Sequence, residues 1–308
     1  RPFDPRLLIS LAPAVAEAAV RSGVATRPIT DMAAYREHLS QFVFRTGLLM
    51  KPMFDRARAD IQRVVYAEGE EETVLRAVQT VVDDQIAKPI LIGRPSVIES
   101  RIKRMGLRLR PGIDFELTNP DDDPRFNEYW QMYHQLMQRK GVSPPAAKAI
   151  VRSRSTVIAA LMVKRGEADA MLCGLVGKYN AKLKHVTEVL GLDPTVKSLS
   201  AMSVVLTPKG PFFFCDTHVQ VDPTAEQIAE SALQAAYRLR LFGITPKVAL
   251  ISHSNFGSID TPCARKMANA LQIMLEKNPR LEAEGEMHAD AALSPEIRAK
   301  IFPDGRLE

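Results

Sequence analysis

The feature that most constrains the fold is an apolar run followed by a polar loop and a helix start. Residues 248–251 read Val-Ala-Leu-Ile, which is typical of a strand buried on both faces of a sheet. Small polar residues and Gly257 come next, and Thr261 with Pro262 then favours the cap and first turn of a helix. This order of strand, loop and helix predicts one βα unit.

Loops of this kind bind ligands in many open α/β sheets, because they lie outside the carboxyl ends of the strands. The free N–H groups at the start of the following helix favour an anion, often a phosphate. An ordinary connection without a ligand is the alternative, and the loop alone does not separate the two.

A second series of elements indicates a parallel sheet. Residues 64–67 are expected to form a strand, a helix then runs to about Gln85, and residues 89–93 form the next strand. Strand, helix and strand at this spacing predict a βαβ unit with a right-handed crossover. Farther along, residues 202–206 and 212–215 are expected to pair as a hairpin. We therefore expect an α/β fold with parallel and mixed sheets flanked by helices.

The length of 308 residues suggests two domains. Residues 1–44 read as two helices without a core of their own, so they are expected to connect to another domain or chain. The first domain is expected at residues 45–165 and the second at residues 166–308, with the change just before a short strand at 170–174. Because the chain begins with Arg1 rather than Met, we expect it to be part of a longer protein.

Composition argues against several classes of protein. With 46% hydrophobic and 25% charged residues the chain is expected to be globular, and no apolar run approaches the length of a membrane span. The net charge is +5, but the basic residues are dispersed among few aromatic ones, which argues against a nucleic-acid partner. Three widely spaced cysteines and the lack of a signal-peptide pattern predict a cytoplasmic protein without disulfides or a zinc site.

Histidines beside carboxylates are candidate metal-binding or catalytic groups. Asp216 and His218 stand two residues apart after an expected strand, as do His288 and Asp290, and His253 lies in the opening loop. Metal ligation needs three or four convergent groups, and no helix-spaced ligand pair is present. We therefore assign no metal ligand.

Other signatures of chemistry are weak or absent. A triad of Ser254, His288 and Asp216 can be drawn, but Ser254 lacks the G-x-S-x-G elbow. The G-x-G-x-x-G and P-loop motifs are absent, which argues against a nicotinamide or ATP site in this segment. Lys184 stands in an expected helix at residues 180–190, where it could hold a phosphate or belong to a solvated basic face.

Four motifs occur in the order found in proteins similar to phosphate acetyltransferases. They are GEADAMLCG at residues 166–174, FCDTHV at 214–219, HSNFGS at 253–258 and GEMHADAA at 285–292. Within three of these motifs the chain has His218, the run His-Ser-Asn-Phe-Gly and His288. This combination resembles one branch of these proteins. That branch is the C-terminal phosphotransacetylase-like domain of the long bacterial NADP-dependent malic enzymes. Residues 1–44 are similar to the tail of the malic-enzyme part that leads into it.

The resemblance implies a two-domain fold of the isocitrate-dehydrogenase-like kind, with a coenzyme A cleft between the domains. It also implies that acetyl-CoA binds in that cleft. The residues expected to bind it are Lys184, His253, Ser254, Asn255, Phe256, Gly257 and Ser258. Asp216, His218, His288 and Asp290 are expected to lie in the same cleft. No catalytic residue is assigned in this segment.

The sequence departs from active transacetylases at three places. Met137 stands where the resemblance places an arginine, and Lys184 stands where it places another. Replacing Arg by Met removes a phosphate-binding fork, and replacing Arg by Lys keeps the charge but loses the bidentate geometry. The Asp-Leu-Ser-Arg-Gly motif of the family is absent, since the chain ends before it.

We therefore expect a regulatory domain that binds acetyl-CoA without acetyl transfer. The resemblance implies a parent enzyme that converts malate to pyruvate and CO2 with NADP and Mg or Mn, using residues outside this segment. The expected partners are the malic-enzyme catalytic domain and a second copy, in a homodimer within a larger homo-oligomer. The alternatives are an active phosphate acetyltransferase and a ligand-free oligomerisation module.

Overall fold

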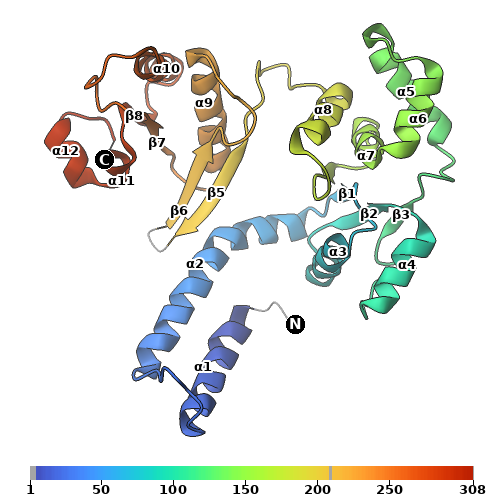
Figure 1. The fold of residues 1–308 in the computed structure, drawn as a ribbon, viewed down its shortest axis with the longest axis horizontal. Helices are drawn as coiled ribbons and strands as arrows, with labels where there is room; N and C mark the ends of the chain where they lie inside the picture. Colours follow the sequence, from blue (N-terminus) through green and yellow to red (C-terminus); the bar gives the residue numbers. More distant parts are fainter. Residues whose placement is uncertain (1–4, 208–209, 308) are drawn as a thin grey trace. The chain divides into compact units, whose positions relative to one another are not determined.

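The computed structural model describes residues 5–207 and 210–307, which form two compact units (Figure 1). One unit comprises residues 54–193. The other comprises residues 194 onward together with those up to residue 53.

The unit of residues 54–193 contains a four-stranded parallel sheet in the order β3-β2-β1-β4. Its strands are β1 (Arg63–Tyr66), β2 (Lys88–Ile92), β3 (Glu116–Thr118) and β4 (Ala170–Leu172). Two crossover helices, α3 (Glu72–Asp84) and α4 (Pro95–Arg104), join the first three strands. The structure thus confirms the predicted parallel βαβ unit.

Helices cover both faces of this sheet, because side chains alternate along each strand. Val65, Ile90 and Ile92 belong to a core with α5 (Phe126–Met137), α6 (Pro144–Ser153), α7 (Ser155–Lys164) and α8 (Tyr179–Leu190). The 3₁₀ turn η1 (Gln138–Lys140) follows α5. Tyr66 and Leu91 belong to a second core with α3 and α4. The sheet therefore lies between two helical layers.

The boundary between the units differs from the one we expected at residue 166. Strand β4 pairs with β1, with Met171 opposite Val65, and Val189 of α8 lies in the same core as α7. Residues 170–193 thus complete the first unit, and the chain divides between Asp193 and Pro194. A pairing between strands about a hundred residues apart leaves no local trace in the sequence, so the expected boundary was placed too early.

The second unit contains a hairpin and a parallel strand pair. The hairpin strands β5 (Met202–Thr207) and β6 (Gly210–Cys215) are antiparallel as predicted, and the expected turn at 208–209 lies outside the described residues. Strands β7 (Lys247–Ile251) and β8 (Glu282–Met287) are parallel. The helices are α9 (Ala225–Leu241), α10 (Pro262–Lys277), α11 (Ala289–Leu293) and α12 (Pro295–Ile301).

Small residues let α9 and α10 approach the strand pair closely. Ala229 and Ala236 of α9, Ala270 of α10 and Ala283 of β8 share one buried core with Leu250 of β7. Strand β7 is less buried than its sequence suggests, however, since Ile251 is 45% exposed. Within the described residues β7 has only β8 as a neighbour, so burial on both faces was an incorrect expectation.

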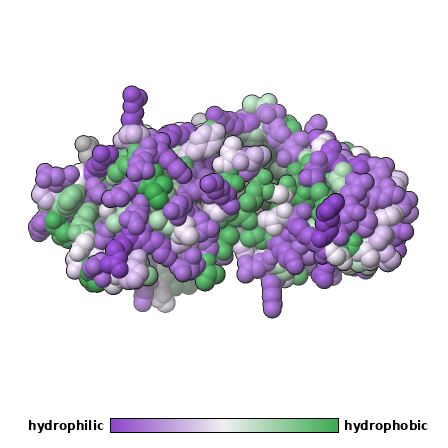
Figure 2. All heavy atoms as spheres, turned by 90° about the horizontal axis from the view of Figure 1, so that it is seen from above, coloured by the Kyte–Doolittle hydropathy of each residue, from purple (hydrophilic) through white to green (hydrophobic). Residues whose placement is uncertain are grey.

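Two helices precede the first strand, α1 (Pro5–Arg21) and α2 (Met32–Ala59). Arg36 Nη2 and Glu17 Oε1 join them at 2.6 Å. Leu11 and Val15 on α1 are exposed. The face shown in Figure 2 is mainly hydrophilic, with apolar side chains in separate patches. Among the described residues, none of the helices has the length and hydropathy needed to cross a bilayer.

Candidate functional site

The candidate site lies where β7 and β8 end. Neighbouring parallel strands finish at the same edge of a sheet, so the loop after β7 meets the residues after β8. Ser252 N donates to Met287 O at 2.9 Å, and Phe256 N donates to Glu286 O at 2.8 Å. The structure therefore brings the predicted loop of residues 253–258 against the predicted His288.

Asn255 and His288 form a reciprocal contact. The backbone N–H of His288 donates to Asn255 Oδ1 at 2.7 Å, so Asn255 Nδ2 is the atom that faces His288 Nδ1 at 3.2 Å. An amide nitrogen only donates, and Nδ1 must accept. The other ring nitrogen, Nε2, lies 3.0 Å from the carbonyl oxygen of His253 and donates to it. These hydrogen bonds hold the side chain of Asn255 at the end of β8.

Ser254 holds the loop from inside. It is 0% exposed, and its hydroxyl donates to Glu286 Oε1 at 2.8 Å and accepts the amide hydrogen of Ile259 at 3.1 Å. The same Glu286 oxygen accepts the Gly257 amide at 2.7 Å. We expected Ser254 to offer a donor to the ligand, but its hydroxyl is buried and already paired in the structure. Its position indicates a role in shaping the loop.

The exposed side of the loop is formed by other residues. His253 is exposed, and its Nε2 lies 3.0 Å from Thr261 Oγ1, which also accepts the Ala264 amide as the cap of α10. Gly257 and Ser258 are exposed too, and Ser258 Oγ accepts the Asn255 amide at 2.9 Å. The predicted helix start at residues 261–262 is confirmed. This side of the loop is thus available to a ligand at the start of α10.

Two successive residues of the loop have left-handed backbone conformations. Phe256 has a φ of 47° and Gly257 one of 80°. For a residue other than glycine this conformation costs about 1–2 kcal/mol. Phe256 is held in it by its bond to Glu286 O and by a stacked contact with Phe302, whose ring centroid is 4.8 Å away.

Asp216 anchors backbone amides around the end of β6. Its carboxylate accepts the amide hydrogens of Ala201 at 2.7 Å, of His218 and Val219, and of Gln220. Burial opposes ionisation of Asp216, but these amides lower its pKa below the ordinary value. The drawn triad of Ser254, His288 and Asp216 is not assembled, because His288 contacts Asn255 and His253 instead.

The remaining predicted cleft residues lie at the ends of β6 and β8. His218 follows β6 and is exposed. Asp290 is exposed in the first turn of α11, and its Oδ1 accepts the Ala291 amide at 2.8 Å. Within the described ranges, no group of three or more His, Cys, Asp or Glu side chains is arranged to hold a metal ion.

Lys184 lies on α8, in the unit of residues 54–193. Its side chain is 72% exposed, and Nζ lies 3.8 Å from Glu188 Oε1. Lys182, two residues earlier on α8, instead reaches inward to Glu68 Oε1 at 2.8 Å and Thr156 Oγ1 at 3.1 Å. That Lys184 contacts the same ligand as the loop of residues 253–258 stays a prediction.

Met137 is buried in the core that packs against β1 and β2. A buried thioether contributes packing and offers no hydrogen-bond donor to a ligand. The structure therefore gives this position a packing role, where the resemblance places an arginine.

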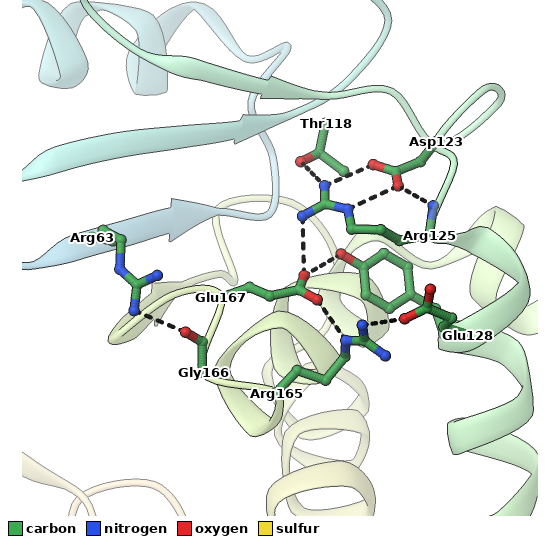
Figure 3. Close-up of polar contacts among 9 residues, drawn as sticks. Arg63, Thr118, Asp123, Arg125, Glu128, Arg165, Gly166 and Glu167 are labelled. Carbon is green, nitrogen blue, oxygen red and sulfur yellow. Dashed lines mark hydrogen bonds and ion pairs between the residues drawn. The ribbon is translucent and has the colours of Figure 1, made fainter.

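A charged network around Glu167, which sequence reasoning did not single out, stabilises the same unit (Figure 3). Glu167 Oε2 accepts Arg125 Nη1 at 3.0 Å and the Tyr129 hydroxyl at 2.5 Å, while Oε1 accepts Arg165 Nε at 2.5 Å. Burial and the bond to Glu167 raise the pKa of Tyr129. Arg125 Nη2 also pairs with Asp123 Oδ2 at 2.8 Å, so the charge of Asp123 is neutralised within the protein. The network joins α5 to the turn between α7 and β4.

Solved structures share the fold, and a family match defines the class of protein. The fold is similar to a phosphotransacetylase from Streptococcus pyogenes, with a TM-score of 0.77 and 24% identity over 84% of this chain and 78% of that one. It is also similar to the EutD phosphotransacetylase from Staphylococcus aureus, with a TM-score of 0.74 over the same shares. Residues 48–308 match the phosphate acetyl/butaryl transferase family, and the chain belongs to it.

The curated relatives indicate a narrower group within this family. The chain is 52% identical to an NAD-dependent malic enzyme of Rhizobium meliloti over 99% of its length, and 51% identical to an NADP-dependent malic enzyme of Escherichia coli over all of it. It spans only 40% and 41% of those proteins. It is also 31% identical over 89% of its length to a phosphate acetyltransferase of Nitratidesulfovibrio vulgaris. The chain is thus a phosphotransacetylase-like domain homologous to part of malic enzymes, as the resemblance implied.

Proposed function

We propose that this chain is the regulatory, acetyl-CoA-binding domain of a malic enzyme and that it does not itself transfer acetyl groups. The observation that carries the proposal is the loop of residues 253–258, which the end of β8 holds in a strained conformation beside the start of α10. The exposed side chains of His253 and Ser258, beside the start of α10, suit the phosphates of a coenzyme. The family relationship supplies the class of ligand, an acyl-CoA.

The proposed lack of turnover follows from Met137. Transfer of an acetyl group to phosphate develops charge that donors in the active site must stabilise. A buried methionine supplies none, and a lysine at position 184 gives charge without the arginine fork. Binding without transfer is therefore the function that these residues support best.

The proposal for the parent protein rests on the relatives. It would convert malate to pyruvate and CO2 in the cytoplasm, using a nicotinamide cofactor and Mg or Mn held by residues outside this chain. The curated relatives are named as NAD-dependent and NADP-dependent enzymes, and for the parent of this chain we propose NADP. We propose a homodimer of this domain within a larger homo-oligomer, joined to the catalytic part through α1 and α2.

Regulation requires acetyl-CoA to bind two states of the assembly unequally, and such coupling is typically about 1–3 kcal/mol. We propose inhibition, because acetyl-CoA is formed from the pyruvate that the parent reaction releases. The test compares the full-length enzyme with a form that lacks this domain, measuring malate oxidation and acetyl-CoA binding by calorimetry. Acetyl-CoA should bind and inhibit only the full-length form. Equal effects on both forms would leave the domain as an assembly module.

Membership in an acyltransferase family supports one competing function, an active phosphate acetyltransferase. Formation of acetyl phosphate from acetyl-CoA and phosphate distinguishes it from the regulatory domain. Calorimetric titration with acetyl-CoA distinguishes the regulatory domain and the active transferase from a ligand-free oligomerisation module. Such a module would bind neither acetyl-CoA nor coenzyme A.

A further inference from the structure

Two buried glutamates lie on β8, and only one of them contacts the candidate site. Glu286 is 4% exposed and accepts hydrogen bonds from the Ser254 hydroxyl and the Gly257 amide. Glu284 is 6% exposed and accepts the amide hydrogens of Gly285 at 3.1 Å and Arg306 at 2.8 Å. The two carboxylates lie on the same strand and are buried to a similar extent. Glu286 bonds to the loop after β7, whereas Glu284 bonds to the backbone at Arg306.

The contacts of Glu286 extend through the whole loop. Its backbone oxygen accepts the Phe256 amide, and one side-chain oxygen accepts from Ser254 and Gly257. Ser254 in turn accepts the Ile259 amide, so a single carboxylate oxygen organises the backbone from residue 254 to residue 259.

These bonds oppose a conformational cost. Phe256 and Gly257 are both left-handed, and a non-glycine residue keeps such a conformation only when its surroundings impose it. Without the acceptor on Glu286, the Gly257 amide and the buried Ser254 hydroxyl would lose their partner. The loop would then relax toward ordinary backbone angles and turn the exposed side chains of His253 and Ser258 away from their present directions.

We propose that Glu286 is the positioning residue of the coenzyme loop: its carboxylate sets the conformation of residues 254–259 and so the affinity for the phosphates of acetyl-CoA. This inference rests on the proposed binding of acetyl-CoA. Glu286 is too deeply buried to contact the ligand and acts through the loop. What the loop needs from it is a hydrogen-bond acceptor, so an uncharged glutamine would serve in its place.

The test uses the whole chain with the substitutions Glu286→Ala, Glu286→Gln and Glu284→Ala. Acetyl-CoA affinity is measured by calorimetry, Tm by calorimetric unfolding, and amide hydrogen exchange of residues 254–259 by mass spectrometry. Glu286→Ala should weaken binding at least tenfold and speed exchange in that segment. Glu286→Gln should bind within about threefold of the unchanged protein, because its amide oxygen accepts both bonds. Glu284→Ala should lower Tm but leave affinity and loop exchange unchanged.

The outcomes separate this inference from the proposed function. If Glu286→Ala binds as tightly as the unchanged protein, or if Glu284→Ala weakens binding equally, Glu286 is not a positioning residue. If the unchanged chain does not bind acetyl-CoA, the proposed function fails, and hydrogen exchange alone then decides whether Glu286 orders the loop. Should Glu286→Ala not fold, Ser254→Ala removes one of the same two bonds and must show faster exchange at residues 257–259.

Discussion

The hydroxyl of Ser254 lies 2.8 Å from Glu286 Oε1, and the two residues stand 32 positions apart in the chain. This bond joins the loop after β7 to the end of β8 inside the protein. It explains why a loop rich in small polar residues has a defined shape at the edge of the strand pair. It also places Ser254 among the residues that support the site rather than among those that face a ligand.

Replacing Ser254 by alanine should reduce stability. The Ile259 amide would lose its acceptor and Glu286 one of its donors, and an unsatisfied buried polar group costs about 1–3 kcal/mol. We expect a loss of this size in the free energy of unfolding, measured in urea. Ser153→Ala is the control, since Ser153 is exposed at the end of α6 and should change stability by less than about 0.5 kcal/mol. Equal losses in both variants would contradict the assigned role of Ser254.

The second prediction concerns turnover. We expect no measurable acetyl phosphate from acetyl-CoA and phosphate, either with this chain or with its full-length parent. A missing preorganised donor costs typically about 3 kcal/mol, or roughly a hundredfold in rate, and Met137 supplies none. A coupled assay that detects acetyl phosphate checks this, with a known phosphate acetyltransferase as the positive control. Robust product formation would favour the active-enzyme alternative.

The third prediction concerns Lys184. If it pairs with a phosphate of acetyl-CoA in a partly buried site, Lys184→Ala should weaken binding by about 1–3 kcal/mol. Lys184→Arg should retain affinity, because it keeps the charge and adds the planar bidentate fork of donors. Calorimetric titration measures both, and Lys164→Ala at the exposed end of α7 is the control. An unchanged dissociation constant in Lys184→Ala would assign Lys184 to a solvated face.

The fourth prediction concerns acid stability of the unit of residues 54–193. Hydrogen bonds from the Arg63 side chain and then from its backbone lower the pKa of Asp169 from 3.8 to about 2. A lowered pKa stabilises the folded state above the unfolded pKa, and this contribution disappears as pH falls through the folded value. Asp169→Asn should therefore be less stable than the unchanged protein at pH 5 and above.

The stability difference between these two proteins should narrow between pH 4 and pH 2. Urea unfolding at a series of pH values measures it, with Asp121→Asn in an exposed loop as the control. A difference that stays constant down to the lowest pH at which both proteins fold would show that the Arg63 pair does not carry the effect.

Local patterns in the sequence were sufficient for several of the elements and for the place of the loop. Thr261 caps α10 by accepting the Ala264 amide, and Thr224 forms a capping box with Gln227 at the start of α9. Both caps join residues within one helical turn of each other. The strand at residues 248–251 and the crossovers of the first sheet follow from hydrophobic periodicity. These features depend on neighbours along the chain, so the sequence displays them directly.

Tertiary structure alone decided which residues meet. The pairing of β4 with β1 placed residues 170–193 in the first unit, and the packing around β1 and β2 buried Met137. The register of β7 and β8, with its irregularity at Leu250 and Ile251, brought Glu286 beneath the loop. A glutamate in a polar stretch carries no local sign of burial, because its partners come from a segment 32 residues earlier. The sequence by itself therefore determined several elements and the family, while the partners of Ser254 and Glu286 depend on how the two strands align.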